Sequence, residues 1–94
     1  MLIRWLAEAS ADLDNIEAFI AADKPGAALH AVRGIIAAVG RLSDYPASGR
    51  PGRVAGTREL VVPGKPYIVP YRVRDGTVEI LRVFHTSRRI GKIK

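Results

Sequence analysis

The residues best suited to chemistry lie near the end of the chain, in the stretch ILRVFHTSRR at positions 80–89. Its apolar part predicts a buried strand that ends at His85, and Arg88 follows three residues later. An imidazole held at a strand end can act as a general acid or base near neutral pH. Neighbouring guanidinium groups would bind a phosphodiester and stabilise added negative charge. The stretch fits a phosphodiester-cleaving site, and equally a basic contact surface whose histidine bonds to a nearby loop.

Other arginines occupy predicted strands and loops from which they could join this histidine. Arg58, Arg72, Arg82 and Arg88 are expected to converge on one side of a sheet. A nuclease would use the set His85, Arg58, Arg82 and Arg88. A protein that binds an anionic partner would use the broader set Arg50, Arg53, Arg58, Arg72, Arg82 and Arg88. Two carboxylates, Glu59 and Glu79, are expected in mid-strand, where pairing with a cross-strand arginine accounts for them.

The charge of the chain is concentrated in its second half. Residues 1–47 carry four basic and six acidic side chains, whereas residues 48–94 carry eleven basic and three acidic ones, eight of the eleven being arginine. Arginine forks match phosphates and carboxylates, so this half is suited to an anionic partner. Charge alone leaves open whether that partner is a nucleic acid or an acidic protein.

Several function classes are disfavoured by composition. The 94 residues contain no cysteine and only two histidines, so we expect no disulfide scaffold, no metal centre and no cofactor. No phosphate-binding loop, zinc spacing or nucleophile elbow occurs. The N-terminus lacks a signal-peptide layout and no apolar run reaches the ~18 residues of a membrane helix, so a cytoplasmic location is expected. The length indicates a single domain over residues 1–94.

Two amphipathic helices are predicted in the first half. From Ala7 onward, apolar residues recur at helical spacing: Ala9, Leu13, Ile16 and Ile20. The sequence ADKPG then interrupts, with Asp23 as the expected N-cap and Pro25 in the first turn of a second helix. The apolar stripe of that helix comprises Ala28, Leu29, Val32, Ile35, Ile36, Val39 and Leu42. Its other face is small (Ala27, Ala31, Gly34 and Ala38) and would allow the first helix to pack closely as a hairpin.

Strands are predicted on both sides of the helices, at 2–5, 58–62, 67–73 and 77–84, with a loop over 43–57. Asp75-Gly76 between the last two strands is a strong signal for a tight hairpin. Pro70 falls in mid-strand, where its missing N–H predicts a bulge. The predicted fold is α+β, in the order β-α-α-β-β-β: an antiparallel sheet with the helical pair packed on one face.

Six segments in order make the chain resemble the ParE/RelE superfamily of toxins from type II toxin–antitoxin modules. They are ADLDNIEAFI, KPGAALHAVRGI, LSDYPASGRPGR, GTRELVV, PYIVPYRV and VEILRVFHTSRR, and they cover nearly the whole chain. The resemblance implies a compact toxin neutralised by a cognate antitoxin. It also implies that an acidic, amphipathic C-terminal segment of the antitoxin wraps over the sheet and helices and folds on binding.

The superfamily has two activities, and the resemblance is closer to the ParE-like branch. RelE-like members cut mRNA on the ribosome, with basic residues on the sheet, sometimes a C-terminal histidine, and a glutamate in the loop after the second helix. His85 matches that histidine, but Gly52 and Arg53 stand where the glutamate is expected, and YIVPY lacks an arginine near its start. The expected function is therefore inhibition of DNA gyrase. The alternatives are a ribosome-dependent mRNA endoribonuclease and a protein that binds its antitoxin without being toxic.

Overall fold

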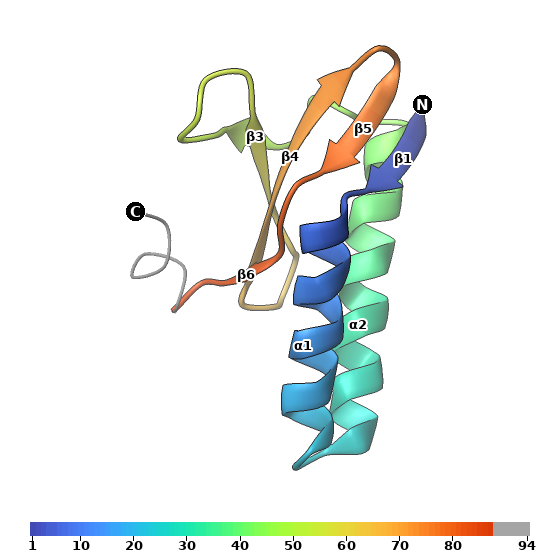
Figure 1. Cartoon of the computed structure of the whole chain (residues 1–94), viewed down its shortest axis with the longest axis vertical. Helices are drawn as coiled ribbons and strands as arrows, with labels where there is room; N and C mark the ends of the chain where they lie inside the picture. Colours follow the sequence, from blue (N-terminus) through green and yellow to red (C-terminus); the bar gives the residue numbers. More distant parts are fainter. Residues whose placement is uncertain (88–94) are drawn as a thin grey trace.

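The computed structural model describes residues 1–87, which form a helical hairpin beside a twisted sheet (Figure 1). The expected α+β architecture is confirmed, with two short strands added to it. The elements in chain order are β1 (Leu2–Trp5), α1 (Ala7–Ala21), α2 (Pro25–Gly40), the 3-10 turn η1 (Arg41–Ser43), β2 (Arg50–Pro51), β3 (Arg58–Val61), β4 (Tyr67–Arg74), β5 (Thr77–Ile80) and β6 (Phe84–His85). In the described part of the chain, no helix has the length and apolar character needed to cross a membrane.

The sheet is mixed, which differs from the purely antiparallel sheet that the sequence predicted. Its order is β1-β5-β4-β3-β2, with β6 also pairing with β4. All pairs are antiparallel except β1–β5, which is parallel. The helical hairpin returns the chain to the end of the sheet where β1 began, and the Met1 ammonium donates to the Ser43 carbonyl there at 3.0 Å. The pairing directions show that β3 and β5 run in the direction of β1, whereas β2 and β4 run the opposite way.

The Asp75-Gly76 hairpin is confirmed. Arg74 pairs with Thr77, and the two residues between them have φ of 52° and 72°. Positive φ at both central positions is the geometry of a type I′ turn, whose twist matches that of the flanking strands. The aspartate and glycine both tolerate this conformation, so the local sequence sets the register of β4 against β5.

The strand predicted over 77–84 is interrupted, and the interruption lies opposite Pro70. Tyr71 pairs with Ile80, but Ile68 pairs with Phe84, so three residues (81–83) face only two on β4. The Pro70 carbonyl accepts the Leu81 N–H at 2.9 Å, which places the side of Pro70 that lacks a donor against this irregular stretch. The expected bulge exists, but its extra residue lies in the segment 81–83 and not in β4. Because the pairing is irregular there, no backbone hydrogen bond from the Pro70 nitrogen is needed.

The core lies between the helices and one face of the sheet. The predicted face of α1 is confirmed, with Ala9 fully buried and Leu13, Ile16 and Ile20 packed against the core. On α2 the buried residues are Ala28, Ala31, Ile35, Ala38 and Val39. Small side chains therefore form much of the buried face, whereas Leu29 and Ile36 of the predicted stripe are 47% and 48% exposed.

Two details of α2 differ from expectation. Its N-cap is Lys24 and not Asp23, and no side chain caps the helix, although Pro25 occupies the first turn as predicted. Gly34 does not face α1, because a Cβ there would lie 2.2 Å from Cε of Lys65. The glycine instead makes room for the lysine side chain from the β3–β4 turn, a tertiary contact that helical periodicity does not reveal.

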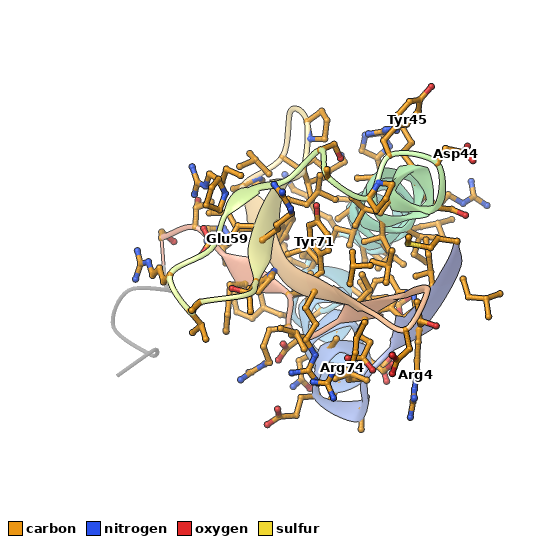
Figure 2. The ribbon with its side chains drawn as sticks, turned by 90° about the horizontal axis from the view of Figure 1, so that it is seen from above. Arg4, Asp44, Tyr45, Glu59, Tyr71 and Arg74 are labelled. Atoms are coloured by element: carbon orange, nitrogen blue, oxygen red, sulfur yellow. The ribbon has the colours of Figure 1, made fainter. Side chains whose placement is uncertain are left out.

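The two faces of the sheet differ in chemistry. Tyr67, Val69 and Tyr71 of β4 point into the core with Val78 and Ile80 of β5. The alternate residues lie on the opposite side, which we call the open face; it carries Arg4, Arg50, Glu59, Arg72, Arg74 and Glu79, as the strand pairing requires. Figure 2 shows Arg4 and Arg74 close together on the side away from Tyr71.

Candidate functional site

A cleft of about 630 Å³ runs between α1 and the end of the sheet, and we call it the α1–β6 groove. Aromatic and aliphatic side chains form much of its wall, and Phe19 is 67% exposed. Polar groups from both sides reach the same groove. Its lining residues are Asp12, Asn15, Ile16, Phe19, Ile20, Tyr67, Arg82, Val83, Phe84 and His85.

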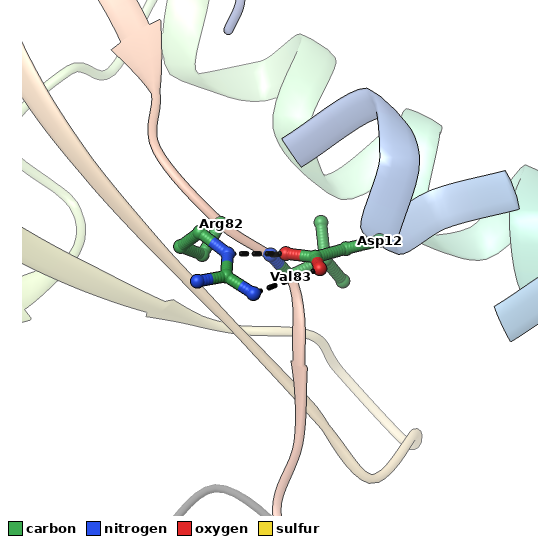
Figure 3. A network of polar contacts seen from close by, with 3 residues as sticks. All are labelled: Asp12, Arg82 and Val83. Atoms are coloured by element: carbon green, nitrogen blue, oxygen red, sulfur yellow. Dashed lines mark hydrogen bonds and ion pairs between the residues drawn. The ribbon is translucent and has the colours of Figure 1, made fainter. Parts of the chain in front are cut away.

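Asp12 and Arg82 form a two-point ion pair at one side of this groove (Figure 3). The Arg82 Nε donates to Oδ2 at 2.7 Å and an Nη donates to Oδ1 at 3.0 Å. The same carboxylate accepts the backbone N–H of Val83 at 2.9 Å. One side chain of α1 thus holds the irregular stretch between β5 and β6, whose backbone lacks a regular strand partner.

This pairing sets the electrostatics of Arg82. Hydrogen bonding to Asp12 raises the pKa of the Arg82 guanidinium, so the group is charged at every accessible pH. The guanidinium carbon also lies 4.8 Å from the centre of the Phe84 ring, a cation–π contact. Arg82 is therefore engaged by a carboxylate and an aromatic ring, and its positive charge is largely compensated within the protein.

His85 is half-buried at the end of β6, where two neighbours hold its ring. The ring stands edge-on to Tyr67, with centroids 5.5 Å apart. Its Nδ1 accepts the backbone N–H of Ser87 at 3.2 Å and lies 2.7 Å from the Ser87 hydroxyl. Because Nδ1 accepts a backbone proton, a neutral ring carries its own proton on Nε2. The predicted alternative in which a strand-end histidine bonds to a neighbouring loop describes this geometry.

Arg58 lies on the core-facing side of the sheet, away from the groove. It pairs across the strands with Tyr71 and donates to the carbonyls of Gly49 at 2.8 Å and Ala47 at 3.3 Å. The Tyr71 hydroxyl accepts the Gly49 N–H at 2.9 Å and donates to the Pro46 carbonyl at 2.7 Å. Arg58 and Tyr71 together secure the loop before β2.

The open face holds the two mid-strand carboxylates, and both are paired with cross-strand arginines as predicted. Arg72 Nε donates to Glu79 at 2.6 Å, and Arg74 Nε lies 3.8 Å from the same oxygen. Arg50 donates to Glu59 at 3.2 Å. The hydrogen bond from Arg72 holds the pKa of Glu79 below its ordinary value, with the charges of Arg74 and Arg4 acting in the same direction.

The arginines expected to converge are therefore dispersed, and this expectation is wrong for the described residues. Arg82 shares the groove with His85, Arg58 is on the core-facing side, and Arg72 is on the open face. The alternation of side chains along the strands and the interruption at 81–83 separate them. Arg53 is exposed in the loop after β2, and Arg88 lies outside the described residues.

Sequence reasoning missed two residues that organise the site. Asp12 lies in the first half of α1, and its partner Arg82 is 70 positions away. Tyr71 lies in the strand predicted over 67–73, and its hydroxyl bonds to a loop 22 to 25 positions earlier. No local pattern carries such pairs. Within residues 1–87, no group of three or more histidine, cysteine, aspartate or glutamate side chains is placed to bind a metal ion.

Comparison with known proteins gives a consistent result. The family "ParE toxin of type II toxin-antitoxin system, parDE" matches residues 3–90. The chain is 52% identical over 88 residues to "Putative toxin Y4kP" of Sinorhizobium fredii, covering 93% of this chain and 90% of that protein. It is 39% identical over 84 residues to "Toxin RelE2" of Caulobacter vibrioides, covering 89% and 93%.

Two solved structures share the fold. One belongs to the chromosomal ParDE toxin–antitoxin system from P. aeruginosa, with a TM-score of 0.83, 34% identity, and coverage of 90% of this chain and 95% of the other. The second belongs to the toxin–antitoxin complex RelBE2 from Mycobacterium tuberculosis, with a TM-score of 0.61, 29% identity, and coverage of 89% and 95%.

Proposed function

The chain belongs to the ParE toxin family of type II toxin–antitoxin systems, and we propose that it inhibits DNA gyrase, blocks replication, and is neutralised by a cognate antitoxin. The observation that carries the choice of target is the dispersal of the candidate nuclease residues. A phosphodiester-cleaving site needs cationic groups aimed at one phosphate together with a general base within hydrogen-bond reach. Within residues 1–87, Arg82 is the arginine that shares the groove with His85, and it is already bound to Asp12.

The assignment to the gyrase-inhibiting branch rests on the contacts that the candidate nuclease residues already make within the fold. Arg58 donates to two loop carbonyls, which leaves it a positioning role in the fold. His85 accepts a backbone N–H from Ser87, which describes a strand-end turn as well as it describes a catalytic imidazole. These contacts favour a protein that acts through its surface, and the greater similarity to the ParDE structure supports the same branch.

An antitoxin is the partner proposed for the α1–β6 groove. The two solved structures described above come from toxin–antitoxin systems. Phe19 and Phe84 offer apolar contacts for an amphipathic segment, and the net charge of +6 favours an acidic one. Such a segment would order on binding, so its removal would free the toxin.

The direct test is a gyrase assay with purified toxin, plasmid DNA and ATP, stopped with detergent and protease. Accumulation of linear DNA, suppressed by adding the antitoxin, is expected, because a trapped cleavage complex yields broken plasmid when the protein is removed. Unimpaired supercoiling and no linear product at excess folded toxin would reject the gyrase proposal. A mock purification from cells that lack the toxin gene and toxin premixed with antitoxin serve as controls.

The rival activities are separated by substitution and by expression. His85→Ala combined with Arg88→Ala should abolish toxicity in a ribosome-dependent mRNA nuclease but leave much of it in a gyrase inhibitor. Circular dichroism of the wild type and of the double variant checks that the fold is kept. If expression of the wild-type chain without antitoxin leaves colony counts unchanged, the protein binds its antitoxin without being toxic.

A further inference from the structure

The open face carries a set of charges that the α1–β6 groove and the proposed antitoxin contact leave unused. In the described part of the chain, four arginines lie on it: Arg4 from β1, Arg50 from β2, and Arg72 and Arg74 from β4. Two carboxylates, Glu59 and Glu79, lie between them. The arginines outnumber the carboxylates two to one, so the face is net positive. The core lies on the Tyr71 side of the sheet, and Figure 2 shows Arg4 and Arg74 on the side away from Tyr71.

The carboxylates are buried beneath the guanidinium groups that they hold. The Glu79 side chain is 11% exposed, whereas Arg72 and Arg74 are 34% and 55% exposed. The Glu59 side chain is 8% exposed and Arg50 is 53% exposed. Each carboxylate thus orients an arginine by accepting one or two of its N–H groups. The remaining N–H donors of that arginine are left facing solvent. A guanidinium oriented in advance loses less freedom when it binds an oxygen ligand.

The strands set the spacing of this array. Arg4 and Arg72 flank Glu79 on neighbouring strands, so their backbones are about 10 Å apart at ~4.8 Å per strand. Arg72 and Arg74 are two residues apart on β4, about 7 Å along the strand. An array of this size can contact several anionic groups at once along an extended polymer.

The apolar content of the face favours a phosphate backbone over a peptide. Peptide recognition depends on apolar anchors that fill pockets, and these lie in the α1–β6 groove. Among the described residues, the exposed apolar side chains of the open face are Leu2 on β1 and Val61 on β3, and β5 and β4 separate them. Phe84 lies on the same face at its β6 end, where it is half-buried and Arg82 covers its ring. Binding to DNA phosphates needs positioned cations and no apolar pocket.

We infer that the open face binds the phosphate backbone of duplex DNA, without reading its sequence. The inference rests on the proposed function, because gyrase acts on DNA and a toxin that also grips the duplex would be retained at the cleavage complex. Arg4, Arg50, Arg72 and Arg74 are the contact residues, and Glu59 and Glu79 are positioning residues. The antitoxin contact in the groove involves a different surface.

The test measures binding of the full chain to a fluorescent 30-base-pair duplex, without gyrase, over a series of salt concentrations. The variant Arg4→Gln/Arg50→Gln/Arg74→Gln removes three cations and keeps the Arg72–Glu79 pair for the fold. The matched control Lys24→Gln/Arg33→Gln/Arg41→Gln removes the same charge from exposed positions on and beside α2. Circular dichroism and antitoxin binding are measured for both variants.

Wild type and control are expected to bind duplexes of unrelated sequence alike, and the open-face variant should bind at least tenfold more weakly at ~100 mM salt. For the open-face variant, the slope of log affinity against log salt concentration should be shallower by about two to three. Each lost phosphate contact reduces the magnitude of that slope by ~0.9. If both variants lose the same DNA affinity, the effect depends on net charge alone and the inference is overturned. Retained DNA affinity with lost antitoxin affinity would assign the face to an acidic peptide and overturn it as well.

The outcome can be separated from that of the gyrase proposal. If the wild type produces linear plasmid with gyrase but does not bind the free duplex, the DNA-contact inference fails and the gyrase function stands. If it binds the duplex but leaves gyrase unaffected, the gyrase function fails, and the charged face then serves DNA binding alone. If both hold, the open-face variant should need at least tenfold more toxin to yield the same linear product.

Discussion

Asp12 of α1 and Arg82 of the β5–β6 connection bond through two hydrogen bonds, at 2.7 and 3.0 Å, across 70 positions of sequence. The same carboxylate accepts the Val83 N–H. The pair joins the helical hairpin to the one place where the sheet loses its regular ladder. It also fixes one wall of the groove proposed for the antitoxin, so the stability of the fold and the shape of that surface depend on the same contact.

The Asp12–Arg82 pair should contribute measurably to stability. Asp12→Asn keeps an oxygen for the Val83 N–H but loses the ionic partner of Arg82, so we expect a loss of about 1–2 kcal/mol in the free energy of unfolding. Asp12→Ala also leaves the Val83 N–H without an acceptor, so it should lower the free energy of unfolding further. Urea unfolding followed by circular dichroism gives both values. Asp14→Asn, an exposed position on the same helix, is the control, and equal effects at the two sites would contradict the role given to Asp12.

The Tyr71 hydroxyl should be needed for the loop before β2. Tyr71→Phe leaves the ring in the core but deprives the buried Gly49 N–H of its acceptor, at an expected cost of about 1–3 kcal/mol. Hydrogen exchange at the Gly49 amide should accelerate in the variant. Tyr45→Phe, at a tyrosine that is 67% exposed, should change neither quantity. An unchanged Gly49 exchange rate in Tyr71→Phe would show that the hydroxyl does not hold the loop.

Gly49 should tolerate no side chain. A Cβ at this position would lie 2.6 Å from both the Tyr71 ring and its hydroxyl and 2.9 Å from the Glu59 carbonyl, so Gly49→Ala must displace buried groups. We expect a loss of about 1–3 kcal/mol. Gly40→Ala is the matched comparison, because a Cβ there meets open space at the end of α2 and should stabilise the helix by up to ~1 kcal/mol. Opposite signs for the two variants in thermal unfolding are the expected result.

Acid should weaken the fold partly through Glu79. Its pKa is lowered in the folded protein, chiefly by the hydrogen bond from Arg72. The folded state therefore binds the proton less readily than the unfolded chain does, so this contribution is present above the unfolded pKa of about 4.3 and is lost as the pH falls through the lower folded value. Stability of the wild type should decline with acid more steeply than that of Glu79→Gln. Parallel profiles from pH 6 to pH 2.5 would argue against this source of acid sensitivity.

Much of the architecture is legible in the sequence because the signals are local. Apolar residues at helical spacing specify α1, Pro25 begins α2, and Asp75-Gly76 requires a turn with positive φ. The six ordered segments identify the toxin family, which the match over residues 3–90 confirms. The concentration of arginine in the second half already calls for an anionic partner.

Only the tertiary structure decided which side chains meet. The extra residue between β5 and β6 changes which side of the sheet the side chains after Ile80 occupy. It lies opposite Pro70, so only the pairing of β4 with its neighbours reveals it. Asp12 finds Arg82, and Tyr71 finds Gly49, because packing the hairpin on the sheet brings together residues that no local pattern relates. The sequence shows that arginines are abundant. The fold places Arg82 in a compensated groove, Arg58 on the core-facing side of the sheet, and Arg4, Arg50, Arg72 and Arg74 on a positive open face.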